Sequence, residues 1–252
     1  ANEHFDKVVN LAAQAGVRYS IENPYAYVES NIDGFLNILE GCRHYKVKHL
    51  IYASSSSVYG LNGKVPFSEK DSIAHPVSLY AATKKSNELM AHTYSHLYGI
   101  PSTGLRFFTV YGPWGRPDMS PFLFADAMLH GRPIKVFNSG DMLRDFTYID
   151  NVVQMNMLAL TTQNPEAVNQ VYNTAFGERT TLNELVGYLK EFLSGYDAGI
   201  AGVEILHGPN RVGDIPHSLA CIDKAKRLLG YEPRYNMRDG LREAVKWYWE
   251  NI

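Results

Sequence analysis

The sequence predicts an α/β fold built around a parallel sheet. Short apolar runs without polar alternation, such as residues 7–13 and 48–55, are typical of strands buried on both faces of a sheet. A longer segment of helical character, residues 79–98, follows them. Strands that alternate with helices indicate parallel pairing, because each crossover between parallel strands needs a helix-sized connection.

The first half of the chain is expected to hold three strands and two long helices. Asn23-Pro24 is predicted to open a helix, because proline is favoured in the first helical turn. Ser78 is suited to cap the next helix and Gly99 to end it. The expected elements are strands at residues 7–13, 48–55 and 102–108 and helices at residues 24–44 and 79–98.

The second half continues the alternation with shorter elements. Two prolines and two glycines make residues 110–118 a predicted loop. Thr181 and Glu184 have the spacing of a capping box, which predicts another helix start. The expected strands are residues 134–137, 170–174 and 203–206, and the expected helices are 121–130, 149–160, one from 181, 223–229 and 237–251.

Composition excludes several classes of function. A formal net charge of −2, without a long charged block, argues against a nucleic-acid partner. No apolar run reaches the roughly 18 residues that span a bilayer, so we expect no membrane partner. Cys42 and Cys221 lie outside metal-ligand spacings. We therefore expect free thiols, no bound metal and a reducing, cytoplasmic compartment.

Tyr80 and Lys84 are the first candidates for catalysis. Their spacing of four places both side chains on one face of the predicted helix. A tyrosine with its ordinary pKa of about 10 is a poor base near neutrality, and a neighbouring ammonium favours the phenolate. Taken alone, the spacing is also compatible with a surface tyrosine beside a solvated lysine.

Four serines, residues 54–57, close the apolar strand at residues 48–55 and begin what we call the serine turn (residues 54–59). A hydroxyl at the carboxyl end of a strand lies where open α/β sheets bind their ligands. Such a group is able to hydrogen-bond a reacting oxygen and share its proton with the tyrosine. A turn that is merely rich in serine is the alternative interpretation.

Together these motifs resemble the extended short-chain dehydrogenases/reductases that act on nucleotide sugars. The segments that carry the resemblance occur in family order over nearly the whole chain: Asn10-Leu11-Ala12-Ala13, Asn31-Ile32-Asp33-Gly34, the serine turn with Val58-Tyr59-Gly60, Tyr80/Lys84, Leu105-Arg106-Phe107-Phe108, Tyr111-Gly112-Pro113, Arg144-Asp145-Phe146 and Arg211-Val212-Gly213-Asp214.

The resemblance implies a Rossmann-like, doubly wound parallel sheet with a smaller C-terminal α/β substrate-binding domain. Residues 1–112 and 145–176 would form the NAD-binding domain, and residues 113–144 and 177–252 the nucleotide-sugar domain. No glycine-rich GxGxxG turn occurs, although such a sheet normally opens with one. The implied chain therefore enters the sheet after its first βαβ unit, and a truncated, cofactor-free binding protein is the non-enzymatic alternative.

The same resemblance assigns roles to individual residues. Tyr80 is implied to be the base, Lys84 its partner and a ligand of the nicotinamide ribose, and Ser55 the catalytic hydroxyl, with Ser56 beside it. The implied cofactor contacts are Leu11, Ala12, Ala13, Asn31, Tyr80, Lys84 and Phe107. The implied substrate contacts are Arg144 and Arg211 on the diphosphate, Asp214 on the uridine ribose and Phe137 on the uracil.

The implied reaction is epimerisation at C4 of a UDP-sugar. A 4,6-dehydratase of this family needs an Asp and a Glu where Ser56 and Ser57 stand, and a uronate decarboxylase needs a Glu at Ser57. Thr109 and Arg116 resemble those of UDP-glucuronate 4-epimerases, in which the serines, Thr109 and Arg116 would surround the carboxylate.

Several alternatives stay open at this point. They are a UDP-N-acetylhexosamine or UDP-glucose 4-epimerase, a UDP-glucuronate decarboxylase, and pairing of Arg116 with Asp118 in a surface loop. The family commonly forms homodimers, and the resemblance implies that the helices at residues 24–44 and 79–98 would make the interface.

Overall fold

The computed structural model describes residues 3–209 and 217–252, which divide into two compact units. Unit 1 contains residues 1–108, 154–174 and 221–232, and unit 2 contains residues 109–153, 175–220 and 233–252. This division differs from the expected domains at every boundary. The first segment of unit 1 ends at Phe108 and not at residue 112, the returning segment runs from Gln154 to Thr174 and not over residues 145–176, and residues 221–232 join unit 1 as well.

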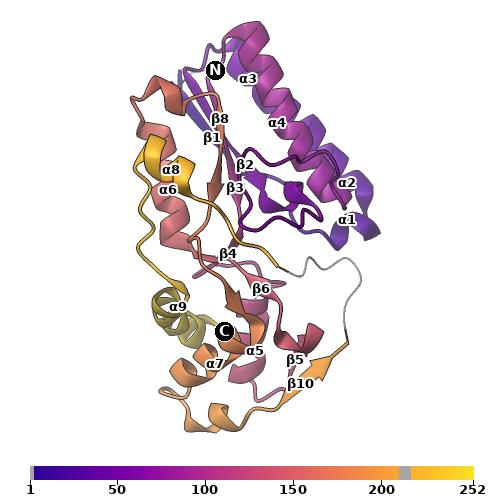
Figure 1. Ribbon diagram of the computed structural model, residues 1–252, viewed down its shortest axis with the longest axis vertical. Coiled ribbons are helices and arrows are strands. Elements are labelled where there is room, and N and C mark those ends of the chain that lie inside the picture. Colours follow the sequence, from indigo (N-terminus) through magenta and orange to yellow (C-terminus); the bar gives the residue numbers. More distant parts are fainter. Residues whose placement is uncertain (1–2, 210–216) are drawn as a thin grey trace. The chain divides into compact units, whose positions relative to one another are not determined.

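Unit 1 is built on a four-stranded, all-parallel sheet, which confirms the predicted fold class (Figure 1). Its strands follow the order β1 (Lys7–Asn10), β2 (His49–Ser55), β3 (Ser102–Phe107) and β8 (Gln170–Thr174). Ile51 lies opposite Val9 on one side and Thr103 on the other, so the carboxyl ends of the strands meet at one edge.

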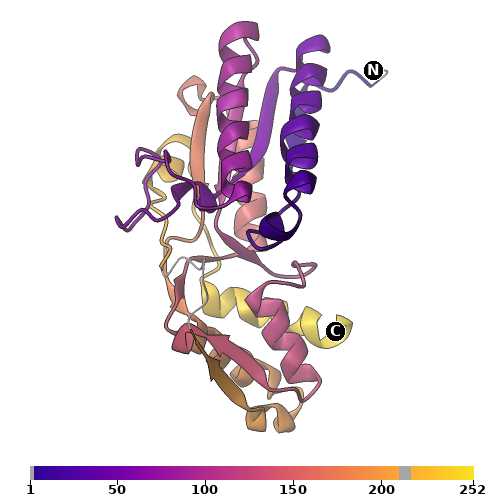
Figure 2. The same ribbon diagram turned by 90° about the vertical axis from the view of Figure 1, so that its right-hand side faces the viewer.

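Two long helices, α3 (Gly34–His44) and α4 (Leu79–Tyr98), lie side by side along this sheet (Figure 2). Their inward side chains pack with β2 in a core that includes Phe35, Leu39, Leu50, Tyr52 and Ala91. The predicted ends of α4 are confirmed. The Ser78 side chain accepts a hydrogen bond from a backbone N–H in the first turn, and Gly99 ends the helix in the left-handed conformation.

The predicted helix at residues 24–44 is interrupted. α1 (Tyr19–Glu22) and α2 (Pro24–Val28) lead into a π-helical turn, η1 (Glu29–Asp33), and only then into α3. π turns are rare and occur often at functional sites. The only residue buried within this turn is Asn31.

Other elements of unit 1 are short. They are η2 (Ser56–Tyr59), η4 (Pro165–Ala167) and α8 (Asp223–Leu229), while α6 (Ile149–Thr161) begins in unit 2 and ends in unit 1. The predicted strand at residues 7–13 is too long by three residues. β1 ends at Asn10, opposite Tyr52, because residues 11–13 leave the sheet and have no partner on β2.

The described residues of unit 2 form three two-stranded sheets and three main helices. β4 (Thr109–Tyr111) pairs with β7 (Phe146–Tyr148), β5 (Ile134–Phe137) with β10 (Ile205–Gly208), and β6 (Leu143–Arg144) with β9 (Thr180–Thr181). The helices are α5 (Ser120–Leu129), α7 (Leu182–Leu193) and α9 (Met237–Asn251), with short turns η3 (Asn138–Gly140) and η5 (Ala198–Gly202). Residues 110–118 are therefore not all loop, because their first two residues belong to β4.

The core of unit 2 forms where α5, α7 and α9 meet, with Phe124, Leu185, Leu189, Leu241 and Tyr248 among its buried side chains. The predicted capping box is confirmed. Thr181 accepts a hydrogen bond from the N–H of Glu184, whose carboxylate accepts one from the N–H of Thr181.

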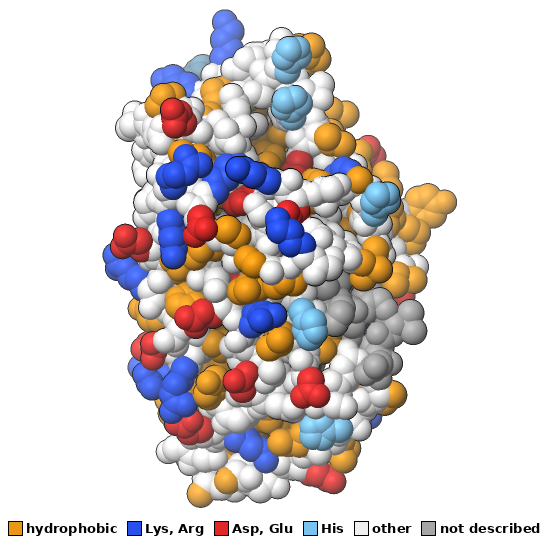
Figure 3. Space-filling model, in the orientation of Figure 1, with side chains coloured by type: hydrophobic (Ala, Val, Ile, Leu, Met, Phe, Trp, Pro, Cys, Tyr) orange, Lys and Arg blue, Asp and Glu red, His pale blue; other side chains and the backbone are white. Residues whose placement is uncertain are grey.

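Over the described residues on the face drawn in Figure 3, acidic and basic side chains are interspersed. Neither sign gathers into an extended patch there. Among the described helices, none is long and apolar enough to cross a membrane.

Candidate functional site

Lys84, on helix α4, is buried against the carboxyl-terminal part of strand β2. Its side chain is 4% exposed, and its Nζ donates a hydrogen bond to the carbonyl oxygen of Ala53 at 3.1 Å. Burial lowers the pKa of this ammonium to about 8, because the charged form loses its hydration. Lys84 is therefore not a solvated surface lysine.

Tyr80 lies one helical turn before Lys84 and is half-buried. Its ring meets the edge of the Tyr27 ring at a centroid distance of 6.0 Å. Its carbonyl accepts the Thr83 hydroxyl at 2.8 Å. The tyrosine is thus held within unit 1 on the helix that also carries the buried lysine.

The serine turn starts directly beyond the Lys84 contact. Ser55 is the buried last residue of β2, and its hydroxyl accepts the N–H of Ser57 at 3.2 Å, which caps η2. Ser56 and Ser57 are half-buried. Since the Lys84 ammonium bonds to Ala53, two residues before Ser55, the fold brings the predicted lysine and hydroxyls to the same strand end.

Asn31 joins the loop after β1 to helix α4. Its amide oxygen accepts the N–H of Gln14 at 2.8 Å, and its amide nitrogen donates to the Gln14 carbonyl and to the Thr83 hydroxyl, both at 3.0 Å. The carbonyl of Asn31 accepts a further hydrogen bond from Asn87 at 2.6 Å. The π turn thus holds the predicted cofactor loop against the helix of the predicted base.

A pocket of about 340 Å³ lies at the carboxyl end of β1. Ala12 and Ala13 line it together with Asn10, Gln14, Ser30, Gly34 and Ile38. Small side chains leave room for a ligand to approach the backbone there. Leu11 is exposed and Phe107 half-buried at the end of β3, and the cofactor role of both stays a prediction.

The remaining predicted substrate residues belong to unit 2. Thr109 is half-buried at the start of β4, and Phe137 lies at the end of β5, packed so closely on Gly208 that a Cβ there would meet its ring at 2.9 Å. Arg144 donates to the Leu143 carbonyl at 3.0 Å. Arg211 and Asp214 lie outside the described residues.

Arg116 pairs with Asp118, as the surface-loop alternative proposed. Its Nε donates to the carboxylate at 3.0 Å, and the pair is largely exposed. The carboxylate-binding role of Arg116, and a shared pocket for Thr109 and the serines, stay predictions.

Asp145 follows Arg144 and organises the backbone of unit 2. Its carboxylate accepts the N–H groups of Phe176, Gly177 and Ala220. Burial raises its pKa to about 7, and the three hydrogen bonds oppose that rise.

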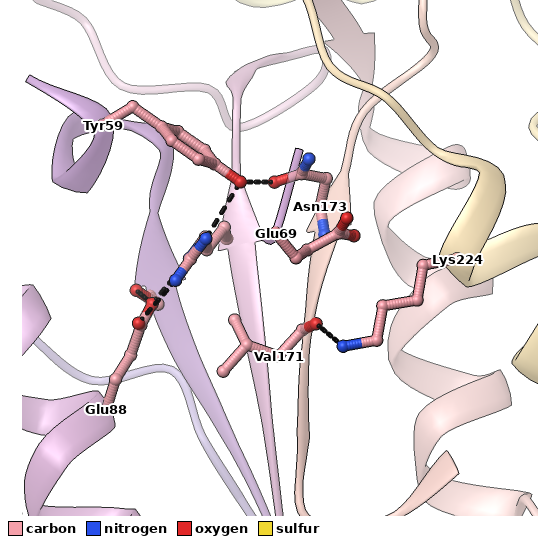
Figure 4. Close-up of polar contacts among 8 residues, drawn as sticks. Tyr59, Glu69, Glu88, Val171, Asn173 and Lys224 are labelled. Carbon is pink, nitrogen blue, oxygen red and sulfur yellow. Dashed lines mark hydrogen bonds and ion pairs between the residues drawn. The ribbon is translucent and has the colours of Figure 1, made fainter. Parts of the chain in front are cut away.

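Sequence reasoning missed a buried polar network next to the serine turn (Figure 4). It consists of Ser54, Tyr59, Glu88, Arg106 and Asn173. One signal was present in the sequence. Glu88 lies one turn after Lys84 on the same helix face, and Arg106 stands between the apolar residues Leu105 and Phe107 of a predicted strand. Among the described residues, no group of three or more acidic, histidine or cysteine side chains is arranged to hold a metal.

Comparison with known proteins identifies the family. The sequence profile described as "NAD dependent epimerase/dehydratase family" matches residues 1–175. The chain belongs to this family. UDP-glucuronate 4-epimerase 4 of Arabidopsis thaliana is 47% identical over 258 residues, which cover 97% of this chain and 58% of that relative.

Solved structures of the family share the fold. UDP-glucuronic acid 4-epimerase from Bacillus cereus, in complex with UDP-glucuronic acid and NAD, superposes with a TM-score of 0.89 at 33% identity, over 98% of this chain and 76% of that one. UDP-glucose 4-epimerase from Thermotoga maritima, with UDP-glucose, also has a TM-score of 0.89. It is 35% identical, and the match covers 97% of this chain and 77% of that one. The family thus includes 4-epimerases of different UDP-sugars.

Proposed function

We propose that this protein interconverts UDP-glucuronate and UDP-galacturonate by NAD-dependent epimerisation at C4. The observation that carries the proposal is the serine turn, in which Ser55, Ser56 and Ser57 present hydroxyls, not carboxylates, beside the buried Lys84. The identity to UDP-glucuronate 4-epimerases supports the same sugar.

The described residues fit a dinucleotide at the carboxyl edge of the sheet. The pocket lined by Ala12 and Ala13 would admit the cofactor, with Asn31 holding the loop, and Leu11, Phe107 and Lys84 would complete the site. Bound NAD would accept hydride from C4 of the sugar and return it. Lys84 would hold the nicotinamide ribose through hydrogen bonds from its ammonium.

Tyr80 is proposed to take the proton of the C4 hydroxyl as that carbon is oxidised, and to give it back when the ketone is reduced. The positive charge of Lys84 favours the phenolate form of such a base. The Ser55 hydroxyl would hydrogen-bond the same oxygen. Return of hydride to the opposite face of the 4-keto sugar would invert C4.

The serines also bear on which reaction follows oxidation. A 4-keto uronate is a β-keto acid that loses CO₂ when the breaking bond aligns with the carbonyl. Hydroxyls of Ser56, Ser57 and Thr109 around the carboxylate, with Arg116 released from Asp118, would restrain that alignment without supplying an acid or base.

We propose that the nucleotide of the substrate binds residues of unit 2. Two of them, Arg211 and Asp214, lie outside the described residues. Arg144 and Arg211 are proposed on the diphosphate, whose oxygens match the planar guanidinium fork, Asp214 on the ribose and Phe137 on the uracil.

The test is product analysis with UDP-glucuronate, UDP-glucose and UDP-N-acetylglucosamine, each at equal concentration with added NAD. We expect UDP-galacturonate from the first and at least about 10-fold lower kcat/KM for the others, since their C6 bears no carboxylate. Release of UDP-pentose and CO₂ would identify a decarboxylase. Preferred turnover of UDP-glucose, the sugar nucleotide in the Thermotoga structure, would move the proposal to that sugar. No turnover and no bound cofactor would leave the non-enzymatic alternative.

Two broader expectations accompany this proposal. A homodimer through α3 and α4 is supported by leucines exposed on them, Leu36, Leu89 and Leu97. The two free cysteines are compatible with a reducing, cytoplasmic compartment. Sedimentation at micromolar concentration tests the first, and cell fractionation the second.

A further inference from the structure

A buried ion pair joins helix α4 to strand β3 beneath the serine turn. Arg106 donates from Nε and from its terminal nitrogen to the two oxygens of Glu88, each at 2.8 Å, and the side chains are only 4% and 8% exposed. Burial alone would lower the pKa of the Arg106 guanidinium, but Glu88 and Tyr59 together outweigh burial and raise it, so the arginine stays charged. Such a pair is weak as a source of stability, because desolvation offsets the attraction.

Each member of the pair holds one end of the serine turn. The Ser54 hydroxyl donates to Glu88 at 2.6 Å. Arg106 donates to the Tyr59 hydroxyl at 2.9 Å and lies 4.9 Å from the centre of its ring. The turn that contains the predicted catalytic serines is therefore closed at both ends through one ion pair.

The same helix face reaches the preceding residue of β2. Lys84 bonds to Ala53 and Glu88 to Ser54, so two side chains one turn apart on α4 bind two successive residues of the strand. Tyr80 lies one turn further back on this face. The position of the tyrosine along the sheet is thus set by the contacts of Lys84 and Glu88.

A third anchor comes from the edge strand β8. The Tyr59 hydroxyl donates to the amide oxygen of Asn173 at 2.7 Å, and the amide nitrogen donates to the Phe67 carbonyl at 2.9 Å. Figure 4 shows Tyr59 and Asn173 facing one another, with Glu69 bound to the backbone of the same strand. The far end of the turn therefore cannot shift without breaking contacts to two strands.

We infer that Glu88 and Arg106 are positioning residues, whose ion pair holds the Ser55 hydroxyl in register with Tyr80 and Lys84. The test of this inference by turnover rests on the proposed function, while its test by hydrogen exchange does not. Displacement of a catalytic group by about 1 Å is enough to reduce turnover by about 100-fold. A small loosening of the turn should therefore slow the reaction before it weakens substrate binding.

The test uses variants that release one end of the turn and leave the ion pair in place. Ser54→Ala removes the hydroxyl that binds Glu88, and Tyr59→Phe removes the one between Arg106 and Asn173. Glu88→Gln would leave a buried guanidinium without its counter-charge and impair folding, so it is the less informative change. For Ser54→Ala and Tyr59→Phe we expect kcat to fall about 10-fold with KM changed less than about 2-fold.

Two matched controls remove similar buried hydrogen bonds elsewhere in unit 1. Thr103→Val breaks the hydrogen bond between the Thr103 hydroxyl and the His49 ring, which is 2.9 Å long. This bond lies at the amino ends of β2 and β3, away from the serine turn. Tyr172→Phe breaks the bond from the Tyr172 hydroxyl to the Ala167 carbonyl, 2.8 Å long. Both controls should lower the melting temperature as much as the test variants while kcat stays within about 2-fold of the wild type.

Hydrogen exchange of the peptide that covers residues 54–60 supplies a readout without substrate. In the protein expressed from its natural gene, Ser54→Ala and Tyr59→Phe should exchange this peptide at least about 5-fold faster, and the controls should not. Faster exchange with unchanged kcat overturns the inference, as do equal effects in test and control variants. If the wild type turns over no UDP-sugar, the proposed function fails, and unchanged exchange in the test variants would then overturn the inference separately.

Discussion

Replacing Lys84 with methionine should make the protein more stable at neutral pH. The ammonium is 4% exposed, and burial lowers its pKa from 10.5 to about 8. At about 1.36 kcal/mol per pKa unit, a shift of that size corresponds to about 3 kcal/mol. Keeping the buried lysine charged lowers the free energy of unfolding by this amount. Loss of the hydrogen bond to Ala53 costs about 1 kcal/mol. Lys84→Met should therefore gain about 2 kcal/mol at pH 7.

The pH dependence identifies the cause of the gain. Because the folded-state pKa is depressed, the unfolded chain binds the proton more readily between pH 8 and 10.5. The stability of the wild type falls as the pH drops through that window, and the cost is present in full below pH 8. The free energy of unfolding of Lys84→Met should therefore exceed that of the wild type most at pH 7. This excess should decrease by about 3 kcal/mol between pH 7 and pH 10.5.

The assay is urea unfolding of nucleotide-free protein at several pH values from 7 to 10.5. Lys85→Met, on the same helix but less buried, is the control for removing a lysine from α4. Other titrating groups cancel in the comparison because they are common to both proteins. A stability difference that stays flat across the window, or a variant that unfolds more easily at pH 7, would refute the reasoning. Turnover should be lost in Lys84→Met despite its stability, as is common when a strained site is relieved.

Three further changes test the site and the two units. Tyr80→Phe should reduce turnover at least about 100-fold with little effect on melting, and near-normal turnover would remove the tyrosine from the chemistry. Asp145→Asn should destabilise the protein by about 1–3 kcal/mol in urea unfolding, because the new amide N–H₂ faces backbone donors; unchanged stability would contradict the hydrogen bonds from Phe176 and Ala220. Gly60→Ala should cost about 2 kcal/mol or more, since φ is +59° and a Cβ would lie 2.4 Å from the His75 carbonyl oxygen, whereas Gly41→Ala, with open space, should be neutral or stabilising in the same thermal melts.

Local chemistry explains where sequence reasoning succeeded. The two ends of α4 and the start of α7 depend on contacts within a few residues, the Ser78 cap, the Gly99 stop and the Thr181–Glu184 box. The central strands were located by a different signal, which is also visible in the sequence. A strand buried on both faces is apolar along its length. The interruption of the predicted helix at η1 was missed, because a π turn has no sequence signature of comparable strength.

By itself the sequence determined the α/β class and most helix and strand positions, because each follows from spacing along one element. The spacing also suggested Tyr80 and Lys84 as candidates, and the resemblance to the family added Ser55. Only the tertiary structure decided where β1 ends, how deeply Lys84 is buried, and that Glu88 and Arg106 close the serine turn. Those properties depend on partners far apart in the chain, as Tyr59 and Asn173 are, 114 residues from each other. Neither periodicity nor capping contains information about contacts over such separations, because packing of the whole sheet creates them.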